Sequence, residues 1–115
     1  MASVPLNILC QSPVSVGMTP RDAVGHTVAL ARDAEALGYH RFWVAEHHSD
    51  AALASAAPEV LVAAIAAQTT RMRVGSGGVL LPYYTPFRVA EQFNLLEALF
   101  PGRIDLGLGR SGGSE

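Results

Sequence analysis

Lysine is missing from this sequence, and charge of either sign is sparse. All eight basic residues are arginines scattered along the chain, only 16% of the residues are charged, and the formal net charge is −2. This pattern offers no basic patch of the kind that binds nucleic acid or an anionic membrane surface. The composition therefore argues against both classes of partner.

Long apolar runs and cysteine pairs are absent as well. No stretch approaches the roughly 18 apolar residues of a membrane span, and the N-terminus lacks a charged region followed by a long apolar segment. The single cysteine, Cys10, has no partner for an internal disulfide. These absences predict a cytoplasmic protein without a membrane span.

Apolar residues make up half of the 115 positions, which suits one globular domain with a modest core better than a disordered chain. Short apolar runs with strand character alternate with segments of helical periodicity. The predicted strands cover residues 6–10, 41–45, 73–81 and 104–108, and the predicted helices begin at Pro20, Pro58 and Pro86. We therefore expect a single α/β domain with the order βαβαβαβ.

The first predicted helix carries the clearest boundary signals. Thr19 is placed as its N-cap, Pro20 occupies the first helical position, and Asp22 is placed to complete a capping box. Gly38 stands where a left-handed residue ends a helix. The apolar stripe expected to face the core consists of Val24, Val28, Ala31 and Leu37.

The alternation of strands and helices predicts parallel strands joined by right-handed crossovers. Two architectures share this order, the open doubly wound sheet and the (β/α)8 barrel. In both, ligands bind at the carboxyl ends of the strands, because the loops there surround a common floor. Polar residues that directly follow a strand are therefore the candidates for a functional site.

The segment Glu46-His47-His48, after the second predicted strand, is the strongest candidate for chemistry. Histidine titrates near neutrality, so an imidazole at a strand end can exchange a proton with a substrate, and a neighbouring glutamate can orient it. Alternatively, the histidines are half-exposed loop residues, or one of them hydrogen-bonds a backbone carbonyl. A metal site is not expected, because adjacent side chains leave a strand in opposite directions and no further histidine or cysteine cluster joins them.

Small residues interrupt the third predicted strand at Gly75-Ser76-Gly77-Gly78. This run lacks the spacing of a dinucleotide-binding loop and is followed by more strand instead of a helix. Two interpretations fit equally: a bulge at a crowded wall, or a bare backbone against which a flat ligand lies.

At the end of the fourth predicted strand, a glycine without a side chain is followed directly by a positively charged residue. Gly109 and Arg110 occur there, followed by Ser111-Gly112-Gly113. The arginine could hold a phosphate or a carboxylate, and it could equally be a surface charge.

Three motifs occur in order: residues 43–48 (WVAEHH), 74–82 (VGSGGVLLP) and 101–110 (PGRIDLGLGR). Together they closely resemble the N-terminal part of the bacterial luciferase-like monooxygenase family, which consists of flavin-dependent enzymes on a TIM barrel. The resemblance covers essentially the whole chain. It implies that the chain is the N-terminal portion of a TIM (β/α)8 barrel.

The resemblance also implies a reaction in which reduced FMN activates O2 to oxidise a small organic substrate; some branches of the family use coenzyme F420 instead. His47 corresponds to the histidine that acts in proton transfer beside the flavin, with Glu46 and His48 as neighbours in the catalytic set. The strand-three bulge that contacts the isoalloxazine ring is matched by Gly75, Ser76, Gly77 and Gly78, with a non-proline cis peptide expected between Ser76 and Gly77.

Gly109 and Arg110 complete the cofactor-binding set that the resemblance implies. Gly109 stands where luciferase itself has a reactive cysteine near the flavin. This difference favours the broader oxidoreductase family over light emission.

A closed barrel of this type needs about 250 residues, so residues 1–115 are expected to be one partial domain, a fragment or a truncated product of a larger protein. The partners implied are the missing half of the barrel or a second copy of the chain, a small-molecule substrate, O2 and a flavin reductase. The alternative is a non-catalytic half-barrel that binds flavin weakly or only mediates self-association. A third hypothesis is an unrelated barrel isomerase with a phosphorylated substrate.

Overall fold

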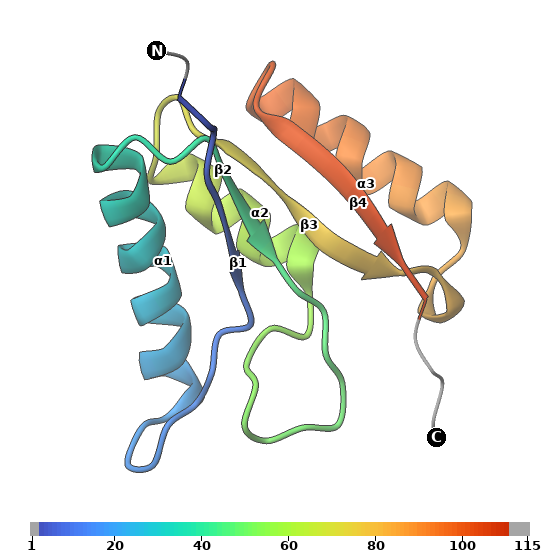
Figure 1. Cartoon of the computed structure of the whole chain (residues 1–115). Helices are drawn as coiled ribbons and strands as arrows, with labels where there is room; N and C mark the ends of the chain where they lie inside the picture. The colour runs from blue at the N-terminus through green and yellow to red at the C-terminus, as the bar shows by residue number, and fades with distance from the viewer. Residues whose placement is uncertain (1–2, 111–115) are drawn as a thin grey trace.

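The computed structural model describes residues 3–110 and confirms the alternation of strands and helices predicted from the sequence (Figure 1). The elements are, in order, β1 (Asn7–Cys10), α1 (Pro20–Ala36), β2 (Arg41–Val44), α2 (Pro58–Ala67), β3 (Arg73–Leu80), the 3-10 helix η1 (Leu81–Tyr83), α3 (Pro86–Leu99) and β4 (Ile104–Gly109). The three helices begin at the predicted prolines, and each strand bound lies within one residue of its prediction. The predicted loop residues Ser111-Gly112-Gly113 lie outside the described residues.

The four strands form one parallel sheet in the order β1-β2-β3-β4, so each strand pairs with the next one in the sequence. Right-handed crossovers that all run in the same direction place every helix on the same face of the sheet. Figure 1 shows the strands in front of α2 and α3, with α1 beside β1. A doubly wound sheet carries helices on both faces and a (β/α)8 barrel carries them only outside, so the topology is that of the barrel.

One apolar core lies between the helices and the covered face of the sheet. Phe42 and Val44 of β2, Val74 of β3, and Val62 and Ile65 of α2 are fully buried in it. Burying a side chain of this size stabilises a fold by about 1.5–3 kcal/mol. Helix α2 contacts both neighbouring helices as well as β2 and β3, which explains its nearly uninterrupted apolar sequence. Even so, no helix within residues 3–110 is long and apolar enough to cross a membrane.

Helix α1 begins with the predicted capping box. Thr19 Oγ1 accepts a hydrogen bond from Asp22 N at 3.1 Å, and Asp22 Oδ2 accepts one from Thr19 N at 2.9 Å. Gly38 has the expected left-handed conformation, with φ +88°. The predicted apolar stripe is wrong in part, because Leu37 lies past the last helical residue and is 77% exposed. Small side chains face the sheet instead and allow the helix to approach it: Ala23, Thr27, Ala31 and Ala34.

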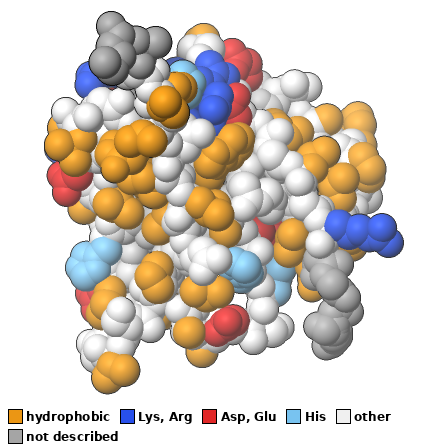
Figure 2. All heavy atoms as spheres, viewed as in Figure 1, with side chains coloured by type: hydrophobic (Ala, Val, Ile, Leu, Met, Phe, Trp, Pro, Cys, Tyr) orange, Lys and Arg blue, Asp and Glu red, His pale blue; other side chains and the backbone are white. Residues whose placement is uncertain are grey.

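The opposite face of the sheet, which we call the open face, is not covered by any helix of the described chain. Leu9 of β1 contributes to it and is 58% exposed. At the N-terminal ends of the strands, Asp105 accepts hydrogen bonds from Arg41 Nε at 2.7 Å and from Arg73 Nε at 2.9 Å. Figure 2, which views this face, shows basic and acidic side chains next to each other near its upper end. The open face is therefore apolar in its middle and charged at one end.

The Trp43 ring lies across β3 and β4 on the open face, at positions that have no side chain. A Cβ atom on Gly75 would come within 2.8 Å of Trp43 Cζ3, and one on Gly107 would lie 3.5 Å from the same atom. The Arg41 guanidinium carbon is 5.2 Å from the centroid of the ring. The missing side chains of Gly75 and Gly107 therefore make room for this indole.

Candidate active site

The carboxyl ends of parallel strands meet at one edge of the sheet, and the site residues predicted from the sequence lie along that edge. The segment of Glu46, His47 and His48 directly follows β2, while Gly77 and Gly78 lie near the end of β3 and Gly109 ends β4. Val44 pairs with Ser76 in the sheet, and Leu80 pairs with Gly109. The fold thus brings three separate motifs of the sequence to one place.

Glu46 is buried, with only 3% of the residue exposed. Its Oε1 atom accepts a hydrogen bond from the backbone N of Leu80 at 3.1 Å, and its Oε2 atom lies 2.5 Å from His48 Nε2. The charge of Glu46 also acts on Tyr84, which lies between η1 and α3. Burial, together with the negative charges of Glu59 and Glu46, raises the pKa of the Tyr84 phenol well above its ordinary value. The carboxylate therefore joins the end of β2 to the connection that follows β3.

His48 is directed to the same connection as Glu46. Its side chain is 30% exposed, and its ring centroid lies 4.5 Å from that of Tyr83 in η1. The contact is tilted, with 41° between the ring planes. His48 is a partly exposed loop residue, as the alternative interpretation expected, and it packs against an aromatic ring and pairs with a carboxylate.

His47 has a different environment. Its backbone N–H donates to the Ser55 carbonyl at 2.8 Å, but its ring atom Nε2 is buried and has no hydrogen-bond partner among residues 3–110. Buried polar atoms in proteins nearly always have a partner, so an unpaired one calls for an explanation. The geometry thus separates His47 from its two neighbours, which are bonded to each other.

Buried hydroxyl groups hold together the loops that follow β1 and β2, through contacts that the sequence did not predict. Ser55 Oγ donates to the Ala45 carbonyl, and Ala54 N donates to the Ser12 carbonyl at 2.9 Å. Ser12 Oγ and Thr27 Oγ1 lie 2.7 Å apart and are both buried. The loops after β1 and β2 are therefore bound to each other and to α1. The only signal in the sequence is a few small polar residues among alanines and prolines.

The glycine-rich run in β3 forms the bulge that was one of its two interpretations. The pairing of β3 with β4 shifts between Ser76 and Val79, and the cis peptide joins Gly77 to Gly78. The expectation of a cis bond between Ser76 and Gly77 is therefore wrong by one peptide. Ser76 remains in the regular ladder, because its Oγ bonds both the carbonyl and the N–H of Gly107, at 2.9 and 3.1 Å.

The glycines of this run face different neighbours. A Cβ on Gly78 would come within 2.8 Å of the Leu108 carbonyl carbon, so this glycine permits close approach of β4. A Cβ on Gly77 would point over the open face, 3.1 Å from Trp43 Cβ and 3.3 Å from Leu9 Cδ1. Arg110, just beyond β4, is exposed. Contact of these residues with a flavin stays a prediction.

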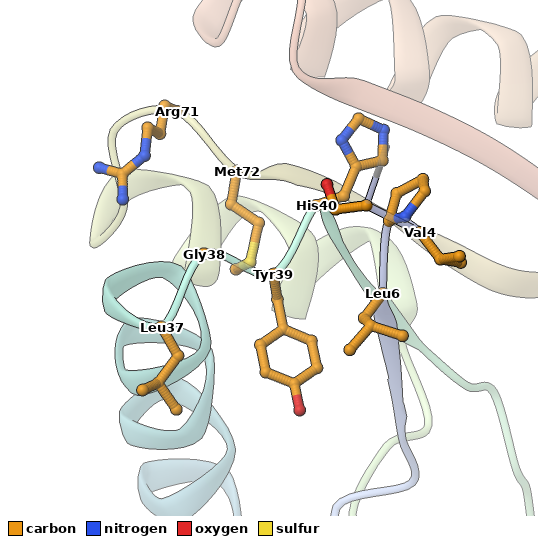
Figure 3. Close-up of a pocket in the computed structure, with 10 residues that line it drawn as sticks. Val4, Leu6, Leu37, Gly38, Tyr39, His40, Arg71 and Met72 are labelled. Carbon is orange, nitrogen blue, oxygen red and sulfur yellow. The ribbon is translucent and has the colours of Figure 1, made fainter. Parts of the chain in front are cut away.

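A hollow of about 570 Å³ lies at the opposite end of the strands. Its lining includes Leu6 just before β1, Tyr39 in the turn before β2, and Arg71 before β3 (Figure 3). In Figure 3 the Arg71 side chain extends away from the Tyr39 ring, so these two polar groups are not directed at one position. This hollow is at the amino ends of the strands, where barrels do not carry their chemistry.

The model of the family described as luciferase-like monooxygenase matches residues 4–115. The chain belongs to this family. It is 56% identical to N-acetyl-S-alkylcysteine monooxygenase of Bacillus subtilis (strain 168), over 94% of this chain and 32% of that protein. The chain spans about a third of the length of the curated relatives it matches. The resemblance inferred from the three motifs is confirmed for this luciferase-like monooxygenase segment.

Solved structures of the luciferase-like fold match the chain closely. The crystal structure of apo-MsnO8 has a TM-score of 0.95 at 53% identity, over 98% of this chain and 34% of that one. The oxygenating constituent of 3,6-diketocamphane monooxygenase from Pseudomonas putida, a type II Baeyer-Villiger monooxygenase in complex with FMN, has a TM-score of 0.89 over 96% of this chain and 30% of that one. Its identity is 24%, so this likeness shows the fold alone. The four strands and three helices are consecutive parts of a luciferase-like TIM barrel.

Proposed function

We propose that this chain forms the flavin side of the active site of a flavin-dependent monooxygenase, which uses reduced FMN and O2 to oxidise a small organic substrate. The proposal rests on the environment of the His47 ring. Its buried Nε2 atom has no partner among residues 3–110 and lies in the segment that leaves the carboxyl end of β2. This edge is where barrels carry out their chemistry.

The residues at this edge fit a flavin. A bound molecule with a polar edge would give His47 Nε2 the hydrogen-bond partner that a buried nitrogen requires. Beside it, the bare backbone of Gly77 borders the open face, with Trp43 and Leu9 underneath. An apolar floor next to a few polar atoms suits a flat aromatic ring.

Bound and reduced FMN would supply the electrons for the reaction of O2 with the substrate. His47 would hold a proton at Nε2 and exchange it with the reacting molecule. The exposed guanidinium of Arg110 would bind an anionic group of the cofactor. FMN is favoured over coenzyme F420, because reduced flavins react with O2 and reduced deazaflavins are hydride donors that react with it poorly.

The complete activity requires more of the barrel than these four strands. Because the chain spans about a third of its relatives, we propose that it is a partial domain and that further strands complete the barrel and the substrate pocket. A flavin reductase in the same compartment, the cytoplasm, would supply reduced FMN.

A second candidate function is association without catalysis. The open face exposes Leu9, and β4 exposes Leu106 and Leu108, at 44% and 56%. Within residues 3–110, β1 and β4 each pair with one neighbour only, so each leaves an edge whose backbone groups are not paired in the described sheet. A chain with these surfaces would bind another copy of itself, and its mass in solution would rise with concentration.

The two candidates are separated by a chimera in which this chain replaces the corresponding segment of N-acetyl-S-alkylcysteine monooxygenase, to which it is 56% identical. We expect the chimera to bind FMN and, with a flavin reductase and O2, to oxidise an N-acetyl-S-alkylcysteine. His47→Gln should lower turnover by at least about a hundredfold, the usual contribution of general acid–base catalysis, with FMN affinity nearly unchanged.

His26→Gln, on the exposed side of α1, is the matched control and should leave turnover unchanged. F420 is titrated in parallel with FMN, and tight binding of F420 alone would reverse the cofactor proposal. A folded chimera that binds neither cofactor would leave association as the function of this chain. Full turnover of the His47→Gln chimera would refute the proton-transfer role.

A further inference from the structure

Glu46 and His47 are neighbours in sequence, yet their side chains serve different parts of the structure. Alternate side chains of an extended segment point to opposite sides, so Glu46 and His48 share one side and His47 takes the other. The contacts agree with this rule, since Glu46 pairs with His48 and no hydrogen bond joins it to His47 within residues 3–110. The carboxylate therefore does not orient the unpaired imidazole directly.

The Glu46 carboxylate is already used on both oxygens. Oε1 accepts from Leu80 N, the last residue of β3, and Oε2 pairs with His48, whose ring packs on Tyr83 of η1. Tyr84 is a further ionisable neighbour of this carboxylate: burial, then the charges of Glu59 and Glu46, raise the pKa of its phenol. All of these contacts fix the connection between β3 and α3 against the segment after β2.

We propose that Glu46 is a positioning residue: its carboxylate fastens the β3–α3 connection through Leu80 and through His48 on Tyr83, and leaves His47 as the proton-transfer group of the segment. The part that concerns His47 rests on the function proposed above. A carboxylate that acts by accepting hydrogen bonds needs its shape and its oxygens, whereas one that transfers protons needs its ionisation. Glutamine keeps the shape and one acceptor oxygen but cannot take up a proton, so it separates the two roles.

The first measurement is hydrogen exchange at the Leu80 amide of the 115-residue chain without flavin. Loss of a hydrogen bond to a charged acceptor costs about 1.5–3 kcal/mol, so Glu46→Ala should speed exchange at Leu80 by about tenfold or more. Glu46→Gln should speed it by less than about threefold. Glu91→Gln on α3, whose side chain is half exposed, is the control and should change nothing. Equal exchange rates in the glutamine and alanine variants would overturn the proposal.

The second measurement is turnover in the chimera. Glu46→Gln should retain most of the rate and Glu46→Ala should lose it. His48→Gln should lose less than about fivefold, because the glutamine amide can still donate to Glu46 Oε2 and one hydrogen bond contributes about 1 kcal/mol. A Glu46→Gln chimera as inactive as Glu46→Ala, with slow exchange at Leu80, would show that the proton of Glu46 is needed and would overturn the positioning role.

The outcomes for the two proposals are distinguishable. If the unmodified chimera neither binds FMN nor turns over, the proposed function fails, while the exchange rates at Leu80 still decide whether Glu46 fastens the connection. If Glu46→Ala does not fold, exchange at the Leu80 amide is compared between the unmodified chain, Glu46→Gln and His48→Ala. His48→Ala should leave Leu80 protected, since Oε1 keeps its contact, and rapid exchange there would contradict the arrangement.

Discussion

Replacing Gly107 by alanine should destabilise the protein strongly, whereas replacing Gly25 by alanine should stabilise it slightly. A Cβ atom at position 107 would lie 2.1 Å from the Ser76 carbonyl oxygen, far inside the roughly 3.5 Å at which non-bonded heavy atoms rest. β3 and β4 would have to separate there. The two hydrogen bonds between Ser76 Oγ and the backbone of Gly107 would then be strained or lost.

The expected loss is about 3–5 kcal/mol, from roughly 1 kcal/mol for each of two hydrogen bonds and about 1–3 kcal/mol for the forced contact. A Cβ on Gly25, in the middle of α1, meets nothing within 4 Å. Alanine there should add about 0.5–1 kcal/mol, because glycine is the more flexible residue in the unfolded chain.

Urea unfolding followed by circular dichroism compares the three proteins under one condition. Both variants replace glycine by alanine. The sign of the change in unfolding free energy therefore shows whether there is room for a Cβ atom at each position. A Gly107→Ala protein within about 1 kcal/mol of the unmodified chain would refute the inference that β3 and β4 are held this closely. A similar loss in Gly25→Ala would show that the effect comes from glycine itself.

Two further predictions concern the open face. Burial alone would raise the pKa of Asp105, but hydrogen bonds from Arg73 and Arg41 hold it below its usual value. The stability from this carboxylate is therefore present above a pH of about 4, its unfolded value, and is lost as the pH falls through the lower folded pKa. Asp105→Asn should cost about 2–3 kcal/mol at pH 7, and the difference from the unmodified chain should shrink in acid unfolding curves. Trp43 is the single tryptophan of the chain, so FMN bound at Gly77 should quench its emission; unchanged fluorescence in the FMN-binding chimera, measured against a Trp43→Phe control, would contradict that placement.

Local signals in the sequence were sufficient to locate the elements. Thr19 and Asp22 form the capping box that their spacing predicts, and all three helices begin at prolines. The order of the strands in the sheet could not be predicted in this way, because periodicity indicates which residues are buried and not which strands are neighbours. The choice between an open sheet and a barrel therefore needed either the motif resemblance or the observed order β1-β2-β3-β4.

The candidate site was predictable in location but not in its internal contacts. The carboxyl-end rule and the motifs brought out Glu46, His47 and His48, and the period of two could have shown that the glutamate pairs with the second histidine. The cis peptide between Gly77 and Gly78 lies at the break in the β3–β4 ladder, and local signals in the sequence do not locate that break to the residue. Contacts such as that of Ser12 with Thr27 join distant segments and leave no local pattern.

The order of the strands also bears on how the chain reaches this structure during synthesis. Every strand pairs with the next one to be made, so no strand waits for a distant partner. Paired residues of neighbouring strands are about 30 positions apart, so each pairing closes a loop of one crossover instead of the whole chain. The sheet can therefore grow one strand and one helix at a time as the polypeptide leaves the ribosome, and the outer edge of β4, unpaired within residues 3–110, would be the template for the further strands proposed above.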